Sequence, residues 1–334
     1  MGRRLISIPG LFLGAVLLVV LSVVWAPAAV IADLLRGRFR FPILRLLAFA
    51  LCWAWLESIG VLVSFALLLV GRARDHRRHF ALQRWWAARL LAALRLTCGV
   101  RVSVENVDAL RPGPVLLFSR HASLADSLVS AYVITSVAGM NPHYVLKREL
   151  LVDPCLDVVG QRLPNHFLDR SASDAEPELL ALERLTAQLD VNSVGVIFPE
   201  GTRANPVKRE KAIAKIGASD AERAARLGPL RHLLPIRPAG AAAMMRGAPT
   251  ADVVLAWHVG FEGLDTFGGI LKALSRPVPP VRFVMRRIPR SDIPAADRDN
   301  MSAFTEWLDT EWHRLDREVD AALAERSGEG RRDG

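Results

Sequence analysis

Two polar residues follow a short apolar segment and could act together on a proton. His121 comes just after PVLLFS (114–119), and Asp126 follows His121 with four residues between them. An aspartate one turn into a helix can bond one ring nitrogen of a histidine at a strand end, which leaves the other nitrogen as a base. Such a base can take a proton from a hydroxyl group as that group attacks a thioester. The same spacing also fits a helix N-terminus with a surface histidine.

A second polar turn follows another apolar segment, in GVIFPEGTRA (195–204). We interpret it as a buried strand that ends in five turn-forming or polar residues, Pro199, Glu200, Gly201, Thr202 and Arg203. Backbone amides, a hydroxyl and a guanidinium in one tight turn suit a phosphate, which arginine binds in a forked geometry. The alternative is an ordinary strand-to-loop turn, since proline, glycine and threonine are common turn residues.

Together the two segments are far more specific than either alone. RHASLAD (120–126) followed by FPEGTR (198–203) resembles the glycerolipid acyltransferase family, which includes the 1-acylglycerol-3-phosphate acyltransferases. YVLKREL (144–150), FLDR (167–170) and LLPIRPAG (233–240) are similar to further blocks of that family, in the expected order. The basic stretch after FPEGTR is closer to the longer lysophosphatidate and lysophosphatidylinositol acyltransferase branch than to the short bacterial enzymes.

The resemblance implies a role for each matching residue. His121 would be the general base that activates a lysolipid hydroxyl, and Asp126 would orient its ring. The acceptor and its phosphate would be held by Glu200, Gly201, Thr202, Arg203, Lys147 and Arg170. The implied mechanism is direct acyl transfer within a ternary complex, and the sequence shows no G-x-S-x-G elbow or activated cysteine that would indicate an acyl-enzyme.

One position departs from the family pattern. Many relatives have asparagine immediately before the histidine, whereas this chain has Arg120. A cation beside His121 would help to keep the base neutral, or it could bind a phosphate of the carrier or headgroup. The departure bears on the identity of the acceptor more than on the type of reaction. His143 and His166 are weaker alternatives for the base.

The elements that position these residues come after two long apolar segments, 11–35 and 46–70, joined by an arginine-rich segment. A helix that crosses a bilayer takes about 20 apolar residues. We therefore predict a membrane-associated helical hairpin over residues 1–78, which either spans the bilayer or lies in one leaflet with its arginines at the headgroups. A cleaved signal peptide is the alternative for the first segment. Arginines that flank the hairpin outnumber those in the segment between its two apolar parts. Because arginines favour the cytoplasmic side of a membrane, we expect both ends of the hairpin to lie in the cytoplasm.

The remaining chain predicts one α/β domain over residues 79–326 and a disordered polar tail over 327–334. We expect strands at 100–105, 114–119, 143–146, 194–198, 253–259 and 281–285, and helices at 79–96, 125–137, 177–189 and 298–326. Strands that alternate with helices indicate a largely parallel sheet flanked by helices, in which sites form beyond the carboxyl ends of strands. The resemblance implies that this is the glycerolipid acyltransferase fold.

Composition narrows the class of partner. The net charge of +9 suits anionic lipid or nucleic acid, and the apolar N-terminal segments with no nucleic-acid-binding motif favour lipid over nucleic acid. The three cysteines, Cys52, Cys98 and Cys155, are too widely spaced for a zinc site. We expect no metal and no cofactor, with acyl-CoA or acyl-carrier protein as co-substrate.

The sequence therefore predicts an acyltransferase at the cell inner membrane or its equivalent, with the catalytic domain in the cytoplasm. The expected acceptor is lysophosphatidic acid, since Lys147, Arg170 and Arg203 suit a small anionic head. Lysophosphatidylinositol and lysophosphatidylglycerol are the alternative acceptors. A hydrolase, in which water replaces the alcohol at the same histidine and aspartate, is the alternative of a different class. Acyl-chain length and oligomeric state are not specified by the sequence.

Overall fold

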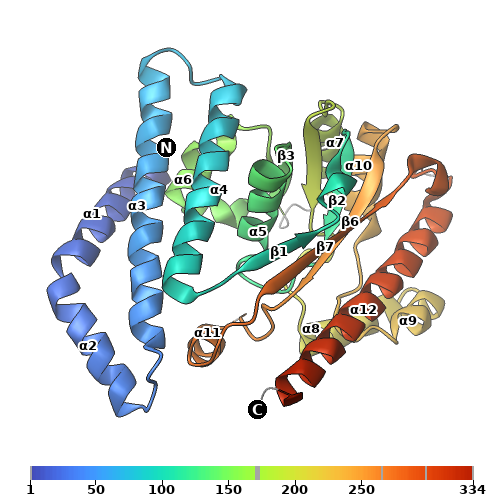
Figure 1. Cartoon of the computed structure of the whole chain (residues 1–334). Helices are drawn as coiled ribbons and strands as arrows, with labels where there is room; N and C mark the ends of the chain where they lie inside the picture. The colour runs from blue at the N-terminus through green and yellow to red at the C-terminus, as the bar shows by residue number, and fades with distance from the viewer. Residues whose placement is uncertain (1, 170–173, 265, 298, 333–334) are drawn as a thin grey trace. The chain divides into compact units, whose positions relative to one another are not determined.

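The chain folds into two compact units (Figure 1). The computed structural model describes residues 2–169, 174–264, 266–297 and 299–332. One unit comprises residues 1–102, 127–172 and 263–280, and the other comprises 103–126, 173–262 and 281–334. The domains predicted with boundaries at residues 78 and 326 are continuous in sequence, whereas each of these units combines three separate segments. The predicted boundaries stay predictions.

The first unit begins with the two apolar segments, which form three helices: α1 (Gly2–Val20), α2 (Ser22–Leu35) and α3 (Pro42–Leu69). The first of the two predicted apolar segments, 11–35, is thus divided between two helices at Leu21. Near this break the Trp25 indole donates to the Leu18 carbonyl at 2.7 Å. Asp33 is buried and accepts from the backbone N–H of Ile43 at 2.9 Å, which closes the turn into α3.

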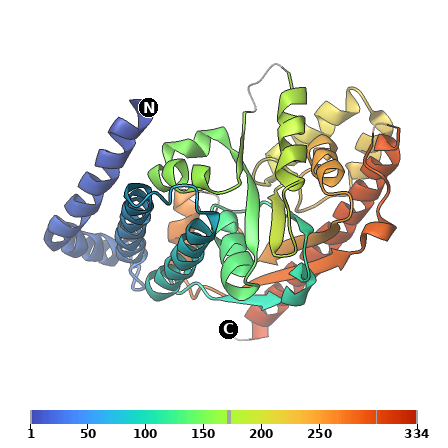
Figure 2. The ribbon, with the colours of Figure 1, turned by 90° about the horizontal axis from the view of Figure 1, so that it is seen from above.

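Helix α4 (His76–Cys98) packs antiparallel to α3, and the two lie side by side in both views (Figures 1 and 2). Its first turn is capped by Asp75, which accepts from the N–H of Arg78, and it ends at Gly99 in the left-handed conformation. The rest of the unit comprises α5 (Asp126–Tyr132), a π-helical segment (Val133–Val137), β3 (Asn141–Lys147), three short helical turns (Arg148–Val152, Pro154–Val158, Gly160–Arg162), β4 (His166–Leu168) and α11 (Phe267–Leu274). Strands β3 and β4 pair in parallel.

The second unit is built on a sheet whose strands lie in the order β1 (Val102–Glu105), β7 (Val281–Ile288), β6 (Asp252–Val259), β2 (Val115–Ser119) and β5 (Ser193–Ile197). Strand β2 is parallel to both β5 and β6, whereas β7 is antiparallel to β6. Every residue of β2 and β5 is buried, as expected for parallel strands covered on both faces. The predicted largely parallel sheet flanked by helices, preceded by apolar N-terminal helices, is confirmed.

The remaining helices of this unit are α7 (Glu176–Thr186), α8 (Pro206–Gly217), α9 (Ala221–Leu227), α10 (Pro238–Gly247) and α12 (Met301–Arg332), with short turns at Val107–Leu110 and Arg290–Asp292. Helix α12 lies along β6 and β7 (Figure 1). It continues to Arg332, into the segment predicted as a disordered tail.

Helix α12 also holds the loop that contains LLPIRPAG. The Asp316 carboxylate accepts from the backbone N–H groups of Arg231, His232 and Leu233, each within 2.9 Å. The Trp312 indole, fully buried, donates to the Leu234 carbonyl at 3.0 Å. This loop is therefore fixed by a helix that follows it far along the chain.

Candidate active site

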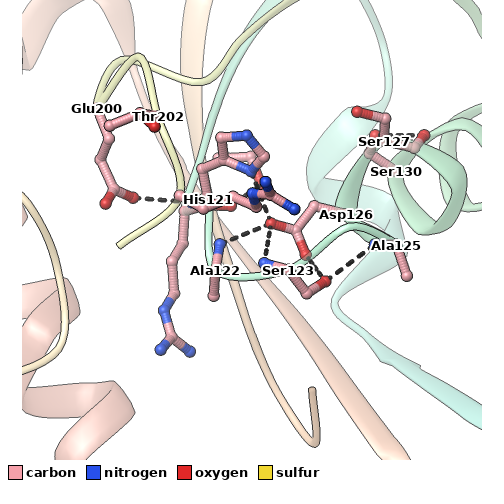
Figure 3. Close-up of polar contacts among 12 residues, drawn as sticks. His121, Ala122, Ser123, Ala125, Asp126, Ser127, Ser130, Glu200 and Thr202 are labelled. Carbon is pink, nitrogen blue, oxygen red and sulfur yellow. Dashed lines mark hydrogen bonds and ion pairs between the residues drawn. The ribbon is translucent and has the colours of Figure 1, made fainter. Parts of the chain in front are cut away.

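The two polar motifs meet at the carboxyl ends of neighbouring parallel strands. Strand β2 ends at Ser119 and β5 ends at Ile197, and the two strands pair in register as far as Phe118 and Ile197. The motif segments beyond them are joined by two hydrogen bonds. The N–H of Ala204 donates to the His121 carbonyl at 2.8 Å, and the N–H of His121 donates to Glu200 Oε1 at 2.8 Å (Figure 3).

The predicted pair of His121 and Asp126 is formed. Nδ1 of His121 lies 2.9 Å from Oδ2 of Asp126 (Figure 3). Since a carboxylate can only accept, Nδ1 carries the proton and Nε2 is the nitrogen able to take another. The ring packs against Phe198, with centroids 4.8 Å apart, and its side chain is 15% exposed. The histidine is therefore oriented as a base with limited access to solvent.

Asp126 is buried and surrounded by donors. Oδ2 also accepts from the N–H groups of Ala122 at 2.6 Å and Ser123 at 2.9 Å, and Oδ1 accepts from the Ser123 hydroxyl (Figure 3). Burial opposes ionisation, but the interactions with His258 and His121 outweigh it. They hold the pKa of Asp126 well below its usual range. The carboxylate is thus ionised at neutral pH.

Glu200 joins three segments of backbone. Its Oε1 accepts from His121, as above, and its Oε2 accepts from the N–H of Leu234 at 2.9 Å. Burial raises the pKa of Glu200 to about 8, although the two N–H groups and nearby Arg120 favour the ionised form. Because both carboxyl oxygens are used by backbone, any effect of Glu200 on an acceptor would be exerted through these loops.

The turn after Glu200 gathers cationic groups. Gly201 has a φ of 73°, a conformation that favours glycine, and Thr202 and Arg203 after it are half-buried. Among the described residues, the buried Nη1 of Arg203 has no hydrogen-bond partner. Lys208 Nζ, from α8, lies 3.3 Å from Thr202 Oγ1 and 3.3 Å from the Arg203 carbonyl. The turn therefore presents two cations and a hydroxyl, a donor set suited to an anion.

Arg120 is turned towards the end of β6. Its side chain is buried, Nη1 donates to the His258 carbonyl at 2.5 Å, and the same nitrogen lies 3.6 Å from Glu262 Oε1. Its predicted contact with a substrate phosphate stays a prediction.

The other predicted site residues belong to the first unit or lie outside the described residues. Lys147 and His143 belong to β3 and His166 to β4, all in the first unit, and Arg170 lies outside the described residues. His258 is a neighbour of the site that sequence reasoning did not single out, and Lys208 belongs to the basic stretch noted after FPEGTR. No group of three or more histidine, cysteine or acidic side chains in the described parts of the chain is placed to hold a metal ion.

A family model described as Acyltransferase matches residues 101–258, which include both motifs. The chain contains an acyltransferase-family domain. This domain includes β2, β5 and β6, and its matched span ends at His258. The resemblance drawn from the two motifs is thereby confirmed.

The acyltransferase-family domain and its N-terminal helices also share their fold with a solved structure. The crystal structure of the 1-acyl-sn-glycerophosphate (LPA) acyltransferase PlsC from Thermotoga maritima is similar, with a TM-score of 0.51 and 15% sequence identity. The similarity covers 84% of this chain and 98% of that chain. Comparison with curated protein sequences finds no match.

Proposed function

We propose that this acyltransferase-family protein transfers a fatty acyl group from acyl-CoA or acyl-carrier protein to the free hydroxyl of lysophosphatidic acid. The observation that carries the proposal is the joining of the two motifs. The His121–Asp126 pair and the cationic turn at Arg203 are linked by Glu200 and by the Ala204 hydrogen bond. One site thus combines a base for the hydroxyl with cations for the phosphate of the same acceptor.

In the proposed reaction, Nε2 of His121 removes the proton from the acceptor hydroxyl. The oxygen attacks the thioester carbonyl carbon, a C–O bond forms, and the C–S bond breaks. The proton held on Nε2 then passes to the departing sulfur, so the histidine returns to its neutral state. Ionised Asp126 stabilises the imidazolium between these steps.

The cationic turn supports a phosphate-bearing acceptor. The buried Nη1 of Arg203, for which the described part of the chain offers no hydrogen-bond partner, would gain one, which offsets the cost of burying it unpaired. Lys208 would add a second charge from α8. Lys147 and Arg170 are proposed as further phosphate ligands on the basis of the motif resemblance. Lysophosphatidylinositol and lysophosphatidylglycerol also carry a phosphate, and a substrate panel separates them from lysophosphatidic acid.

The N-terminal helices support membrane attachment. Helices α1 and α3 are long and apolar enough to cross a bilayer, and α1–α3 expose large apolar side chains such as Leu5, Val23 and Leu69. Helix α3, however, is paired along its length with α4, which carries five arginines, Arg77, Arg78, Arg84, Arg89 and Arg95.

The contacts within this helix pair favour insertion into one leaflet. Trp86 Nε1 donates to Glu57 Oε1 at 3.0 Å, and Ser64 Oγ lies 3.3 Å from His79 Nε2. A crossing of the whole bilayer would carry these polar groups and the arginines of α4 into hydrocarbon, which is costly. In the proposed arrangement, the exposed apolar side of α1–α3 faces lipid and α4 stays at the headgroups. The cytoplasmic orientation stays a prediction.

The proposal is tested by acyl transfer in liposomes. Labelled acyl-CoA or acyl-carrier protein is offered with a panel of lysophospholipids to wild type, His121→Ala and His76→Ala, an exposed histidine that serves as the control. Loss of a general base is expected to lower the rate by roughly 10²–10⁴-fold. Unchanged transfer by His121→Ala would remove His121 from the mechanism. Release of free fatty acid by wild type, without transfer, would favour the hydrolase.

A further inference from the structure

A second histidine lies against the proposed site from a strand far along the chain. His258 is the residue before the last of β6, and it is fully buried. Strand β6 extends past the end of β2, since Ser119 at the end of β2 pairs with Ala256. The N–H of Arg120 continues this contact by donating to the Ala256 carbonyl at 2.9 Å. The end of β6 therefore lies beside the segment that leads to His121.

His258 faces the oxygen of Asp126 that His121 does not use. Its Nε2 lies 3.0 Å from Asp126 Oδ1, whereas His121 Nδ1 lies 2.9 Å from Oδ2. The 3.0 Å separation is within ion-pair range, but the N–H is not aligned for a linear hydrogen bond. A rotation of the ring about its χ2 angle would change that alignment. The carboxylate thus lies between two imidazole rings.

The surroundings of His258 bear on which of its two ring nitrogens carries a proton. The ring stacks on Phe283 with centroids 6.3 Å apart and meets the edge of Phe261 at 5.6 Å. Among the described residues, its Nδ1 has no hydrogen-bond partner. A proton on Nδ1 would therefore be buried without an acceptor, which costs free energy. These contacts favour a ring proton on Nε2, the nitrogen that lies 3.0 Å from Asp126 Oδ1.

We infer that His258 is a positioning residue that holds the Asp126 carboxylate from the side opposite His121 and thereby sets the basicity of His121. This inference rests on the proposed function of the same site. Arg120 reinforces the arrangement, since its guanidinium donates to the His258 carbonyl at 2.5 Å. His258 touches neither substrate nor reacting atoms in the proposed mechanism.

The sign of the effect follows from the charges. The Nε2–H of His258 places a partial positive charge on the Asp126–His121 pair, and its removal leaves a carboxylate that attracts protons more strongly. The coupled pair then binds a proton at higher pH, so the acidic limb of the pH profile of kcat/KM moves to higher pH.

The other charged groups around His258 make contacts that do not involve its side chain. Arg120 and Glu262 face it beyond the end of β6, and Glu200 acts on Asp126 from the turn after β5. The residue opposite on β7 is the apolar Phe283. From α12, Glu318 bonds Trp257 next to His258 in the chain. A shift in the pH profile of a His258 variant is therefore assigned to His258.

The test compares two substitutions in the full chain in liposomes. His258→Phe keeps a ring but removes the donor, and His258→Gln keeps an N–H donor near the position of Nε2. In His258→Phe we expect kcat/KM at neutral pH to fall about tenfold and the acidic limb to rise by about half to one pH unit. In His258→Gln the limb should return towards its wild-type position. An equal loss at every pH, with no shift of the limb, would assign His258 to packing alone and overturn the inference.

A second readout is independent of turnover. Histidine-selective isotope labelling allows the His121 ring to be titrated by NMR in wild type, His258→Phe and His258→Gln. An unchanged His121 midpoint in His258→Phe overturns the inference even if wild type proves inactive on lysophospholipids, an outcome that would refute only the proposed function. Circular dichroism checks folding, and if His258→Phe fails to fold, the comparison is made between His258→Gln and the shorter His258→Asn, whose amide cannot reach Asp126.

Discussion

Replacement of Asp126 by asparagine removes one charge at the centre of the site while nearly preserving its shape. In wild type the two carboxylate oxygens face His121, His258, the N–H groups of Ala122 and Ser123, and the Ser123 hydroxyl. An amide can accept on only one side, so its NH₂ group must face donors on the other. The variant therefore loses both the charge that stabilises the His121 imidazolium and part of the hydrogen bonding.

The expected loss of rate and the expected loss of stability in Asp126→Asn can be estimated separately. Two unit charges about 4 Å apart interact by about 4 kcal/mol at an effective dielectric constant of about 20, which corresponds to about 10³ in rate. Exchanging charged for neutral hydrogen bonds costs about 1 kcal/mol each, and with one buried donor unpaired we expect a fall of about 2–4 kcal/mol in the free energy of unfolding. Because the pKa of Asp126 in the folded protein lies below its usual value of 3.8, the stability that the ionised carboxylate contributes is present above about pH 4 and is lost as pH falls through the folded pKa.

The assay measures single-turnover acyl transfer and denaturant unfolding on the same preparations. Asp299→Asn, at an exposed position, is the matched control and should change neither quantity. If Asp126→Asn keeps kcat within about threefold of wild type while folded, the electrostatic reasoning is wrong. If the loss of rate only follows the fraction unfolded, Asp126 is a structural residue and not part of the proton transfer.

Three further outcomes follow from the contacts. Burial raises the pKa of Glu200 from 4.5 to about 8, so the stability contributed by its protonated form is present below pH 4.5 and is lost as pH rises through about 8. The melting temperature of Glu200→Gln should therefore depend less on pH between these values than that of wild type. An equal dependence on pH in the two proteins would contradict this assignment. Arg203→Lys should raise KM for lysophosphatidic acid about tenfold with little change in kcat, whereas monoacylglycerol, which lacks the phosphate, should show no such change in KM. Asp316→Ala leaves three backbone N–H groups without their acceptor and should lower the free energy of unfolding by about 3 kcal/mol. The control Asp320→Ala, on the surface of the same helix, should lower it by less than about 1 kcal/mol. Similar losses in the two variants would refute this account.

Much of the site is readable in the local sequence. Continuous apolar runs that end in polar motifs identify β2 and β5, because strands covered on both faces carry few polar residues. The spacing of His121 and Asp126 also predicted their pairing, and the two side chains meet at 2.9 Å, although Asp126 is the first residue of α5 and the residues between it and His121 are not helical. The same reasoning identified the apolar N-terminal helices, although it did not predict the break at Leu21.

Other parts of the site depend on which segments the fold brings together. Hydrophobic periodicity says which face of a strand is buried, but not which strand lies next to it. His258 contacts Asp126 only because β6 is the parallel neighbour of β2 and extends past its end. Glu200 reads as a turn residue in the sequence, yet its two oxygens bond the backbone of His121 and Leu234, and α12 in turn holds the loop of Leu234. Local sequence thus determined the proposed base, its partner and the cationic turn. Tertiary structure alone decided what surrounds them, because hydrogen-bond partners far apart in the chain are set by strand order and helix packing.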